Sequence, residues 1–363
     1  MKIIDIETIR LTIPSRGLNS ALGRFPTFDY TIVIVRTDEG IEGYGEIDTL
    51  WDGTSGVQIA FVAEAFRPAL LGENPLSINA CLRKMDTPFE GAWPARAAVE
   101  MALFDIAGKA LNTPVYNLLG GKSRESVVLS RSISMAAPAD MAAEAKEVVA
   151  AGFTCVKVKV GRPGGDDVDA VAAIRDAVGP KVLVRVDANM GWRTAKDAIR
   201  QIKAMEAYGI HSVEQPIPPG NLAAMRLVRE SVDTPIMVDE SVWGPDDAWA
   251  IMQAGAADIL NIYVAESGGL TNSSLIFRMA EVAGVGCVIG AMPEMGIGTA
   301  AAVHLGIAMT NLHDPCDPCG VMYHDVDVIH ETLRIEDGRI WPPEGAGLGV
   351  TLDYDKLEQF RRT

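Results

Sequence analysis

Three acidic residues, Asp187, Glu214 and Asp239, each end a short apolar run, and they follow one another at near-equal intervals. One β/α unit takes roughly 25 residues, and side chains at the C-terminal ends of successive parallel strands converge on one mouth of a β/α barrel. Carboxylate oxygens are hard ligands that suit Mg²⁺ better than zinc. The spacing therefore predicts a barrel with a magnesium site at its mouth.

Two lysines precede this series in a segment with the alternation of a β-strand. The segment reads Val156-Lys157-Val158-Lys159-Val160, so both lysines lie on the same face of their strand. A lysine beside a divalent cation can lose its proton and act as a base. Together with the carboxylates, the two lysines predict an enzyme that uses a metal to help remove a proton from carbon.

The composition of the whole chain limits its partners. The chain has 363 residues, more than one barrel of about 250 residues needs, so an accessory domain is expected. Its net charge of −16 argues against nucleic acid, whose phosphates require a basic surface. No apolar stretch approaches about 20 uninterrupted residues, and residues 1–5 lack the form of a signal peptide. We therefore expect a cytoplasmic protein without a membrane partner.

The cysteines do not predict a disulfide framework, because there are five of them without regular spacing. Cys316 and Cys319 form a CxxC, but no second CxxC completes a zinc site. The pair also follows a helix-like segment instead of opening one, as redox motifs do. We expect a structural loop there.

Residues 1–125 are predicted to form an α+β domain. Three β-rich runs come first, and the segment 95–111 has strong helical periodicity. Between the first two runs, residues 14–28 are rich in Gly, Ser and Pro, so we expect a loop that could act as a lid. The expected strands are residues 3–11, 29–36 and 41–48.

Residues 126–320 show the alternation of a β/α barrel, in which short β-rich runs are each followed by a helical stretch. The helical rhythm fades after about residue 312. In the remaining segment, 321–363, a hairpin is expected with its turn at Asp337-Gly338, and this tail could rejoin the first domain. The expected barrel strands are residues 128–133, 155–160, 182–187, 212–214, 236–239, 259–264 and 287–290.

Several motifs, found in order along nearly the whole chain, resemble the enolase superfamily. Residues 95–120 look almost residue by residue like the signature helix of its mandelate racemase and muconate lactonizing enzyme group, and residues 267–269 and 290–300 resemble the muconate lactonizing subgroup. The resemblance implies a modified TIM barrel, (β/α)7β, with an N-terminal α+β capping domain that the C-terminal segment completes. The strand-end motifs that agree are Lys157-Val-Lys159, Val186-Asp-Ala-Asn189, Val213-Glu-Gln-Pro216 and Val238-Asp-Glu-Ser241.

The resemblance implies a role for each strand-end residue. Asp187, Glu214 and Asp239 would bind one Mg²⁺ per subunit, which would hold a substrate carboxylate and stabilise the enediolate formed when the α-proton leaves. Lys159 would be the base, and Lys157 would lower the pKa of that base and help to neutralise the intermediate. These roles agree with general chemistry. The α-proton of a carboxylate is too weakly acidic for a protein base to remove unless fixed cations neutralise the negative charge on the carboxylate.

Four further residues belong to the predicted site. Asn189 and Glu240 would orient the substrate or the metal ligands. Met292 and Glu294 lie in a segment expected to contact the substrate, for which the resemblance suggests an amino-acid derivative, a hydroxyproline-like compound or another small hydroxy or cyclic acid. The segments expected to determine the substrate are residues 15–28, 48–54 and 292–295.

The sixth barrel strand departs from the subgroup pattern. Members of the subgroup usually carry a lysine there that faces the first base across the substrate, and this chain has Tyr263 at that position. Racemization with two bases needs an acid and a base on opposite faces. A neutral tyrosine, with an ordinary pKa of about 10, can still donate a proton or a hydrogen bond to a leaving group. We therefore expect one-base chemistry, either β-elimination of water by a dehydratase or cycloisomerization.

Three alternatives stay open. A racemase or epimerase of an amino-acid derivative could pair Lys159 with a partner other than lysine. The barrel could bind its metal without turnover, because Tyr263 removes one catalytic group. The strand-end acids could merely cap the helices that follow them, although three in register beside Lys-x-Lys argue against this. As partners we expect a small carboxylate substrate and further copies of the chain in a closed homo-oligomer.

Overall fold

The N-terminal cap is built on a three-stranded antiparallel sheet of β1 (Ile3–Pro14), β4 (Thr27–Thr37) and β5 (Glu42–Asp48), in the order β1-β4-β5. All three strands predicted for this part of the chain are confirmed. The computed structural model describes every residue except 18, 49–54, 87–91, 163, 314 and 363. The smaller helices of the cap are α1 (Ser55–Phe61), a π-helical turn (Val62–Phe66), α2 (Arg67–Leu70), α3 (Ile78–Met85) and α5 (Val115–Leu118).

Helix α4 (Trp93–Ala110) packs directly on this sheet and is the segment with the strongest predicted helical periodicity. Nearly all of its residues are buried, the charged Arg96, Glu100 and Asp105 among them, so the helix is enclosed on all sides. Gly43 and Gly45 of β5 permit the close packing, because a Cβ at either position would collide with the carbonyl oxygen of Ala102 or Ala98. The small residues on both sides thus bring the backbones of helix and strand into contact.

The predicted lid loop between β1 and β4 contains a short hairpin, β2 (Asn19–Ser20) and β3 (Gly23–Arg24). The carbonyl oxygen of Asn19 accepts a hydrogen bond of 3.0 Å from the backbone N–H of Met135, which follows the first barrel strand. This hairpin therefore connects the cap to the barrel.

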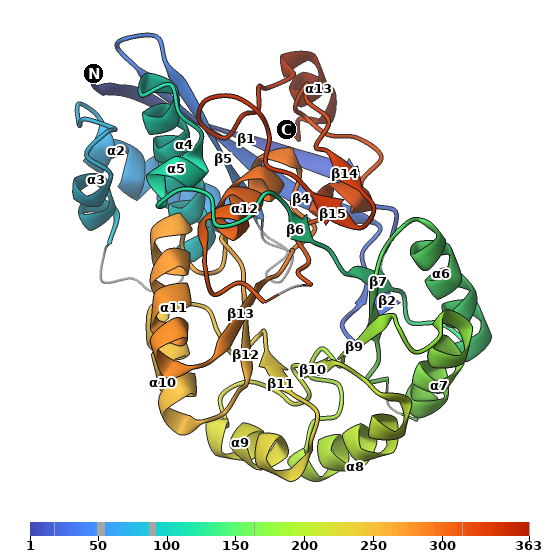
Figure 1. Cartoon of the computed structure of the whole chain (residues 1–363). Helices are drawn as coiled ribbons and strands as arrows, with labels where there is room; N and C mark the ends of the chain where they lie inside the picture. Colours follow the sequence, from blue (N-terminus) through green and yellow to red (C-terminus); the bar gives the residue numbers. More distant parts are fainter. Residues whose placement is uncertain (18, 49–54, 87–91, 163, 314, 363) are drawn as a thin grey trace.

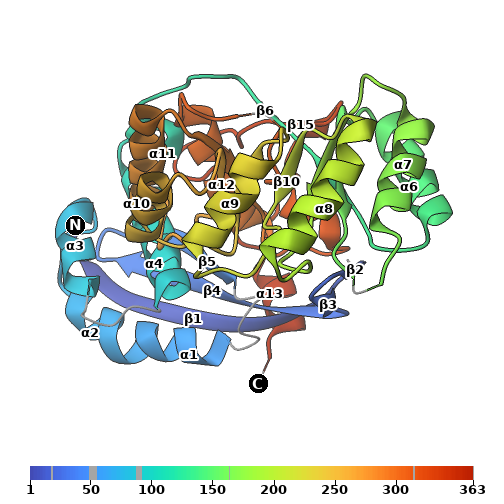
Figure 2. The same ribbon diagram turned by 90° about the horizontal axis from the view of Figure 1, so that it is seen from below.

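Seven parallel strands form the second sheet, in the order β13-β12-β11-β10-β9-β8-β7. Figure 1 shows the sheet curled, with helices on its outer side, and Figure 2 shows the cap sheet lying along one side of the barrel helices. The seven predicted barrel strands are thereby confirmed, although only residues 131–133 of the first predicted run, 128–133, belong to this sheet. The strands are β7 (Arg131–Ile133), β8 (Cys155–Lys159), β9 (Leu183–Asp187), β10 (Ser212–Glu214), β11 (Ile236–Val238), β12 (Ile259–Ile262) and β13 (Gly286–Ile289). The helices are α6 (Pro138–Ala150), α7 (Asp167–Val178), α8 (Ala195–Met205), α9 (Leu222–Ser231), α10 (Pro245–Ala254), α11 (Leu270–Ala283) and α12 (Gly296–Ala308).

An irregular segment at residues 312–317, of which 314 is not described, occupies the eighth position of the barrel. Leu312 pairs with Cys287 of β13, and Cys316 pairs with Leu129 on the other side, both in parallel. The sequence prediction missed this segment as a strand, because Pro315 and Pro318 interrupt any strand pattern. The CxxC expected to form a structural loop thus contributes Cys316 to closure of the barrel.

The C-terminal segment returns to the cap, as predicted. The expected hairpin forms from β14 (Ile335–Glu336) and β15 (Arg339–Ile340), and β15 pairs with β6 (Val127–Val128). Helix α13 (Tyr354–Phe360) packs on β1, and the backbone N–H of Arg362 donates to the carbonyl oxygen of Arg10 at 2.9 Å. The domain boundaries at 125/126 and 320/321 stay a prediction. In the described ranges, no helix has the length and apolarity needed to span a bilayer.

Two buried carboxyl groups of the cap accept hydrogen bonds from the first turns of barrel helices. Glu46 of β5 accepts from the backbone N–H groups of Met295 and Gly298, each at 2.8 Å, where α12 begins. Glu100 of α4 accepts from the N–H of Thr271 at 3.3 Å, where α11 begins. Helix N-termini carry unpaired N–H groups and partial positive charge, so these carboxyl groups hold the cap on the barrel.

Replacing Glu46 by Gln should flatten the pH dependence of stability. Burial raises the pKa of Glu46 from its ordinary 4.5 to about 8, against the effect of its two N–H donors. Because ionisation is then less favourable in the folded than in the unfolded chain, the contribution of this group to stability is lost as the pH rises towards 8. Between about pH 5 and about pH 8 we expect the free energy of unfolding in urea to fall more for the wild type than for Glu46→Gln. Equal slopes would contradict the raised pKa.

Candidate active site

The predicted metal ligands and lysines meet inside the barrel because their strands pair in register. Lys159 of β8 lies opposite Asp187 of β9, and Asp187 lies opposite Glu214 of β10. Asp239 directly follows β11, the next strand. Alternation turns Lys157 to the same side as Lys159, and all five side chains are buried. The structure thus brings together the five residues that the strand ends predicted.

Lys159 contacts both a metal-ligand candidate and a predicted orienting residue. Its Nζ lies 2.5 Å from Asp187 Oδ2 and 3.0 Å from Asn189 Oδ1. Asn189 has a positive φ of 38°, and its backbone N–H donates to Asp187 Oδ1 at 2.9 Å. Its side-chain Nδ2 donates to Glu240 Oε1 at 3.0 Å. Asn189 and Glu240 are therefore linked to the candidate base and to the candidate ligand beside it.

Lys157 is held as a permanent cation. Its Nζ lies 2.7 Å from Asp317 Oδ2 and 3.3 Å from Glu214 Oε1. Burial acts to lower the pKa of this ammonium, but the carboxylates of Asp317, Glu214 and Asp187 outweigh burial and raise the pKa well above its usual range. Lys157 is thus suited to neutralise negative charge and not to accept a proton.

Two charged residues that the sequence did not single out complete this network. Arg185 donates to Glu214 Oε2 at 2.8 Å and to both carboxylate oxygens of Asp317 at 3.2 Å. Arg185 stands two residues before Asp187, so the alternation that identified the lysines could also have found it. Asp317 lies in the irregular closing segment, where no sequence pattern marks it.

Tyr263 lies beside the metal-ligand candidates, immediately after β12. Its hydroxyl donates to Asp239 Oδ2 at 2.8 Å and lies 3.3 Å from the side-chain amide of Asn261. Burial, together with the carboxyl groups of Asp239 and Glu214, raises the pKa of Tyr263 well above its ordinary value of 10. Tyr263 is therefore a neutral hydrogen-bond donor.

The three predicted metal ligands do not form a ready-made triad. Within the described ranges, no group of three His, Cys, Asp or Glu side chains has the spacing needed to hold a metal ion. Asp187 and Glu214 instead contact the cationic side chains of Lys159 and Arg185, at 2.5 and 2.8 Å. Protein cations thus lie next to two of the predicted ligands.

Asp239 and Glu240 have surroundings that suit a divalent cation. Among the residues that the structure describes, no cationic side chain forms a hydrogen bond or ion pair with Asp239 or Glu240. Burial and neighbouring carboxyl groups raise the pKa of Asp239 well above its ordinary value and that of Glu240 to about 7. Buried carboxylates need a positive partner, and hard oxygen donors suit Mg²⁺. The chemistry of these oxygen donors therefore fits a hard divalent cation such as Mg²⁺.

A cavity of about 60 Å³ adjoins these side chains. Ser20, Leu22 and Phe25 of the predicted lid loop contribute to its wall, which supports a covering role for that loop. Residues 49–54, also expected to determine the substrate, lie outside the described residues. The site residues that line this cavity are Lys157, Lys159, Asn189, Asp239, Tyr263, Met292 and Asp317.

Glu294, predicted to contact the substrate, lies behind the cavity wall. Its Oε1 accepts a hydrogen bond of 3.0 Å from the backbone N–H of Met292, and the side chain is buried. Burial raises the pKa of this carboxyl to about 7. Glu294 therefore shapes the turn that carries Met292, and only Met292 of this pair reaches the cavity.

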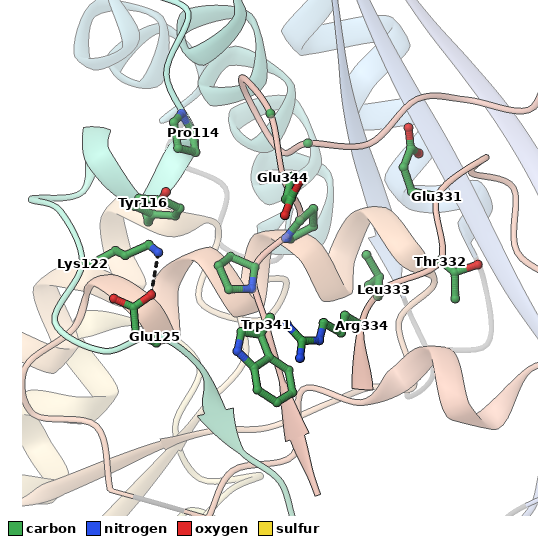
Figure 3. Close-up of a pocket in the computed structure, with 14 residues that line it drawn as sticks. Pro114, Tyr116, Lys122, Glu125, Glu331, Thr332, Leu333, Arg334, Trp341 and Glu344 are labelled. Atoms are coloured by element: carbon green, nitrogen blue, oxygen red, sulfur yellow. Dashed lines mark hydrogen bonds and ion pairs between the residues drawn. The ribbon is translucent and has the colours of Figure 1, made fainter. Parts of the chain in front are cut away.

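A larger cavity, of about 630 Å³, lies between the α5 region and the C-terminal segment (Figure 3). Three of its charged side chains are engaged: Lys122 pairs with Glu125 at 2.8 Å, and the Arg334 guanidinium lies 4.2 Å from the centroid of the Trp341 ring. None of the strand-end residues lines it. The predicted catalytic residues therefore favour the smaller cavity in the barrel as the candidate active site.

Comparisons with known proteins agree with this placement. Residues 3–120 match the mandelate racemase/muconate lactonizing enzyme N-terminal domain, and residues 140–356 match the enolase C-terminal domain-like family. The L-Ala-D/L-Glu epimerase of Bacillus subtilis is 35% identical over 96% of this chain and 97% of its own length.

Two solved structures are similar along the whole chain. Muconate lactonizing enzyme from Pseudomonas fluorescens, complexed with muconolactone, has a TM-score of 0.95 at 30% identity and covers 99% of both chains. Dipeptide epimerase from Enterococcus faecalis, complexed with Mg and the dipeptide L-Leu-L-Tyr, has a TM-score of 0.92 at 33% identity, covering 97% of this chain and 100% of the other. The chain therefore belongs to the enolase superfamily, in its mandelate racemase/muconate lactonizing enzyme group, and is an enzyme of that superfamily.

Proposed function

We propose that this enzyme removes the proton α to the carboxylate of a small substrate, with Lys159 as the base and Mg²⁺ held by Asp187, Glu214 and Asp239. The observation that supports this most is the 2.5 Å contact of Lys159 Nζ with Asp187, which puts the base next to the metal ligands. When bound, the metal supplies positive charge that makes the α-proton acidic enough for an amine base. Lys157 adds a second fixed charge that stabilises the resulting enediolate.

One-base β-elimination of water is the outcome that Tyr263 favours. In epimerization, the group on the second face of the substrate must accept the proton in one of the two directions. A phenol whose pKa is raised well above 10 is not available as a base near neutral pH. In elimination, Tyr263 needs only to donate a hydrogen bond to the departing oxygen.

The elimination balances with a single base. Lys159 takes the α-proton, the bond between the β-carbon and its hydroxyl breaks, and the electrons of the C–H bond form the new double bond. The lysine ammonium then gives its proton to the departing hydroxyl, which leaves as water. A hydroxyproline-like amino acid meets these requirements.

Two other outcomes have support from the relatives. Cycloisomerization also needs one base, and a muconate lactonizing enzyme is among the similar structures. Racemization or epimerization of an amino-acid derivative is supported by the Bacillus subtilis epimerase, and it would need a partner for Lys159 on the opposite face. A metal-binding barrel without turnover is set aside, because the chain belongs to a superfamily of enzymes.

Product analysis separates these outcomes. The Mg²⁺-loaded protein would be incubated with cis- and trans-hydroxyprolines, N-acylated amino acids and muconate, and each mixture followed by proton NMR. Elimination predicts that a 3-hydroxyproline loses two proton signals, that of the α-proton and that of the proton on the hydroxyl-bearing β-carbon. Appearance of the opposite α-epimer, or of a lactone from muconate, would refute elimination as the main reaction.

Replacing Tyr263 by Phe should slow elimination by about 10²-fold, because the departing oxygen loses its hydrogen-bond donor. The rate of α-proton exchange should fall much less, since Lys159 remains in place. Both rates can be read from one NMR time course in D₂O. Unaltered elimination would remove Tyr263 from the mechanism, and a matched Tyr354→Phe variant controls for loss of a hydroxyl elsewhere.

A further inference from the structure

His324 lies where three segments of the chain meet behind the smaller cavity. It is 5% exposed and directly follows Tyr323 of the C-terminal segment. The rings of His324 and Phe28 of β4 meet edge to face, with 5.6 Å between their centroids. Its Nε2 lies 2.6 Å from the carbonyl oxygen of Pro293, in the turn after β13. Phe28, Pro293 and Tyr323 all line the cavity, so His324 connects three parts of the cavity wall.

The root of the lid loop is attached at the same place. Ser15 and His324 form an antiparallel bridge, and the backbone N–H of Arg16 donates to the carbonyl oxygen of Tyr323 at 3.0 Å. The guanidinium of Arg16 forms an ion pair of 2.7 Å with Asp325. A displacement of His324 would therefore disturb both the lid loop and the cavity wall.

The contacts of His324 determine where its ring carries a hydrogen. A carbonyl oxygen can only accept, so Nε2 carries the hydrogen and donates it to Pro293. The Tyr30 hydroxyl donates to the same carbonyl oxygen at 2.7 Å and lies 3.0 Å from Nε2. Nδ1 is buried and has no hydrogen-bond partner among the residues that the structure describes. A second proton on this ring would therefore place a positive charge in a buried position without a bonded carboxylate.

The groups that face His324 keep its ring neutral. Burial is the largest effect and lowers the pKa of the imidazole below its ordinary 6.5. Arg16 acts in the same direction, whereas the Pro293 carbonyl and Asp325 act to raise this pKa. Tyr30 also stays neutral, because burial and nearby carboxyl groups raise its pKa well above 10. These carboxyl groups belong to Asp48, Glu46, Glu294 and Asp327.

We infer that His324 is a pH-sensitive latch: its neutral ring holds the lid loop and the adjoining cavity wall in place, and a second proton on the ring releases both. Opening of the cavity then becomes more frequent in mild acid. The inference goes beyond the proposed function, because it applies to any substrate that this cavity takes.

The size of the effect follows from the two states of the ring. In an opened structure the imidazole has its ordinary pKa of about 6.5, and in the closed structure its pKa is lower. The closed structure is therefore fully favoured above pH 6.5 and loses stability as the pH falls through this value. With a closed ring that stays neutral, the opened fraction rises about 10-fold between about pH 7.5 and about pH 5.5.

Nearby carboxyl groups titrate in the same range but with the opposite sign. Burial raises the pKa of Glu294 to about 7 and that of Asp327 to about 6. A group whose pKa is raised by folding favours the folded structure more as the pH falls. Opening in acid therefore reports on His324 and not on these carboxyl groups.

Hydrogen exchange at the root of the lid loop tests the inference without a substrate. The full chain would be exchanged at about pH 7.5 and about pH 5.5, and the protection of the Arg16 N–H would be measured by mass spectrometry and corrected for the intrinsic rate. We expect the wild type to lose protection about 10-fold at the lower pH. His324→Gln should show no such loss, because its amide can donate to Pro293 but takes up no proton. His330→Gln, at an exposed histidine of the same segment, should behave as the wild type.

Equal protection of the wild type at both pH values, or the same loss in His324→Gln, would overturn the inference. A second measurement needs no variant. Exchange of the imidazole C2–H in the wild type, followed by mass spectrometry in the peptide that contains His324, gives the pKa of this ring. We expect a midpoint below 6.5, and a midpoint at or above 6.5 would refute the latch.

Discussion

The Lys159→Ala variant is expected to lose α-proton exchange by at least about 10³-fold while still binding Mg²⁺. Lys159 is the amine that contacts both Asp187 and Asn189, at 2.5 and 3.0 Å, and its strand lies next to the strand of the first proposed metal ligand. Lys157 cannot take over its role, because its carboxylate neighbours raise its pKa well above the usual range. Exchange is measured by NMR in D₂O, and Mg²⁺ binding by calorimetry.

Two comparisons make the Lys159 result interpretable. Lys146 is an exposed lysine on α6, and the Lys146→Ala variant should exchange at the wild-type rate. Retained Mg²⁺ binding in Lys159→Ala would show that the metal site is intact. Exchange at the wild-type rate in Lys159→Ala would refute its assignment as the base.

The Asp239→Asn variant is expected to bind Mg²⁺ at least about 100-fold more weakly and to lose exchange in parallel. Asp239 is buried and has no cationic partner in the described part of the chain, and burial with neighbouring carboxyl groups raises its pKa. An amide in its place supplies one neutral oxygen instead of a charged one. Changes to residues that only support metal ligands already cost about 10–100-fold, so loss of a direct ligand should cost at least as much.

Calorimetric titration with Mg²⁺ tests this expectation, with Asp176→Asn on the exposed side of α7 as the matched control. Partial recovery of exchange at high Mg²⁺ concentration is predicted, because the defect lies in affinity. Wild-type affinity in Asp239→Asn would exclude Asp239 from the metal site.

Strand-end residues were predictable because two periodicities reinforce each other. Alternation within β8 places Lys157 and Lys159 on one face, and the spacing of whole β/α units places Asp187 and Glu214 beside them. Arg185 follows the same alternation, two residues before Asp187 on β9, so the pattern that predicts the lysines also places its side chain on the inner face.

Asp317 and the cavity wall could not be read from the sequence. Asp317 lies in an irregular closing segment, 160 residues from its partner Lys157. The wall joins Leu22, Met292 and Tyr323, which come from three distant segments without a shared pattern. Contacts of this kind depend on how the cap, the barrel and the C-terminal segment pack together, and local periodicity carries no information about that packing.

Metal-assisted proton removal by Lys159 is tested most directly by following the α-proton signal of 3-hydroxyproline in D₂O. The three samples contain wild-type enzyme with Mg²⁺, EDTA-treated enzyme, and the Lys159→Ala variant with Mg²⁺. We predict loss of the signal in the first sample and its persistence in the other two. Loss of the signal in EDTA-treated enzyme or in Lys159→Ala would contradict the mechanism.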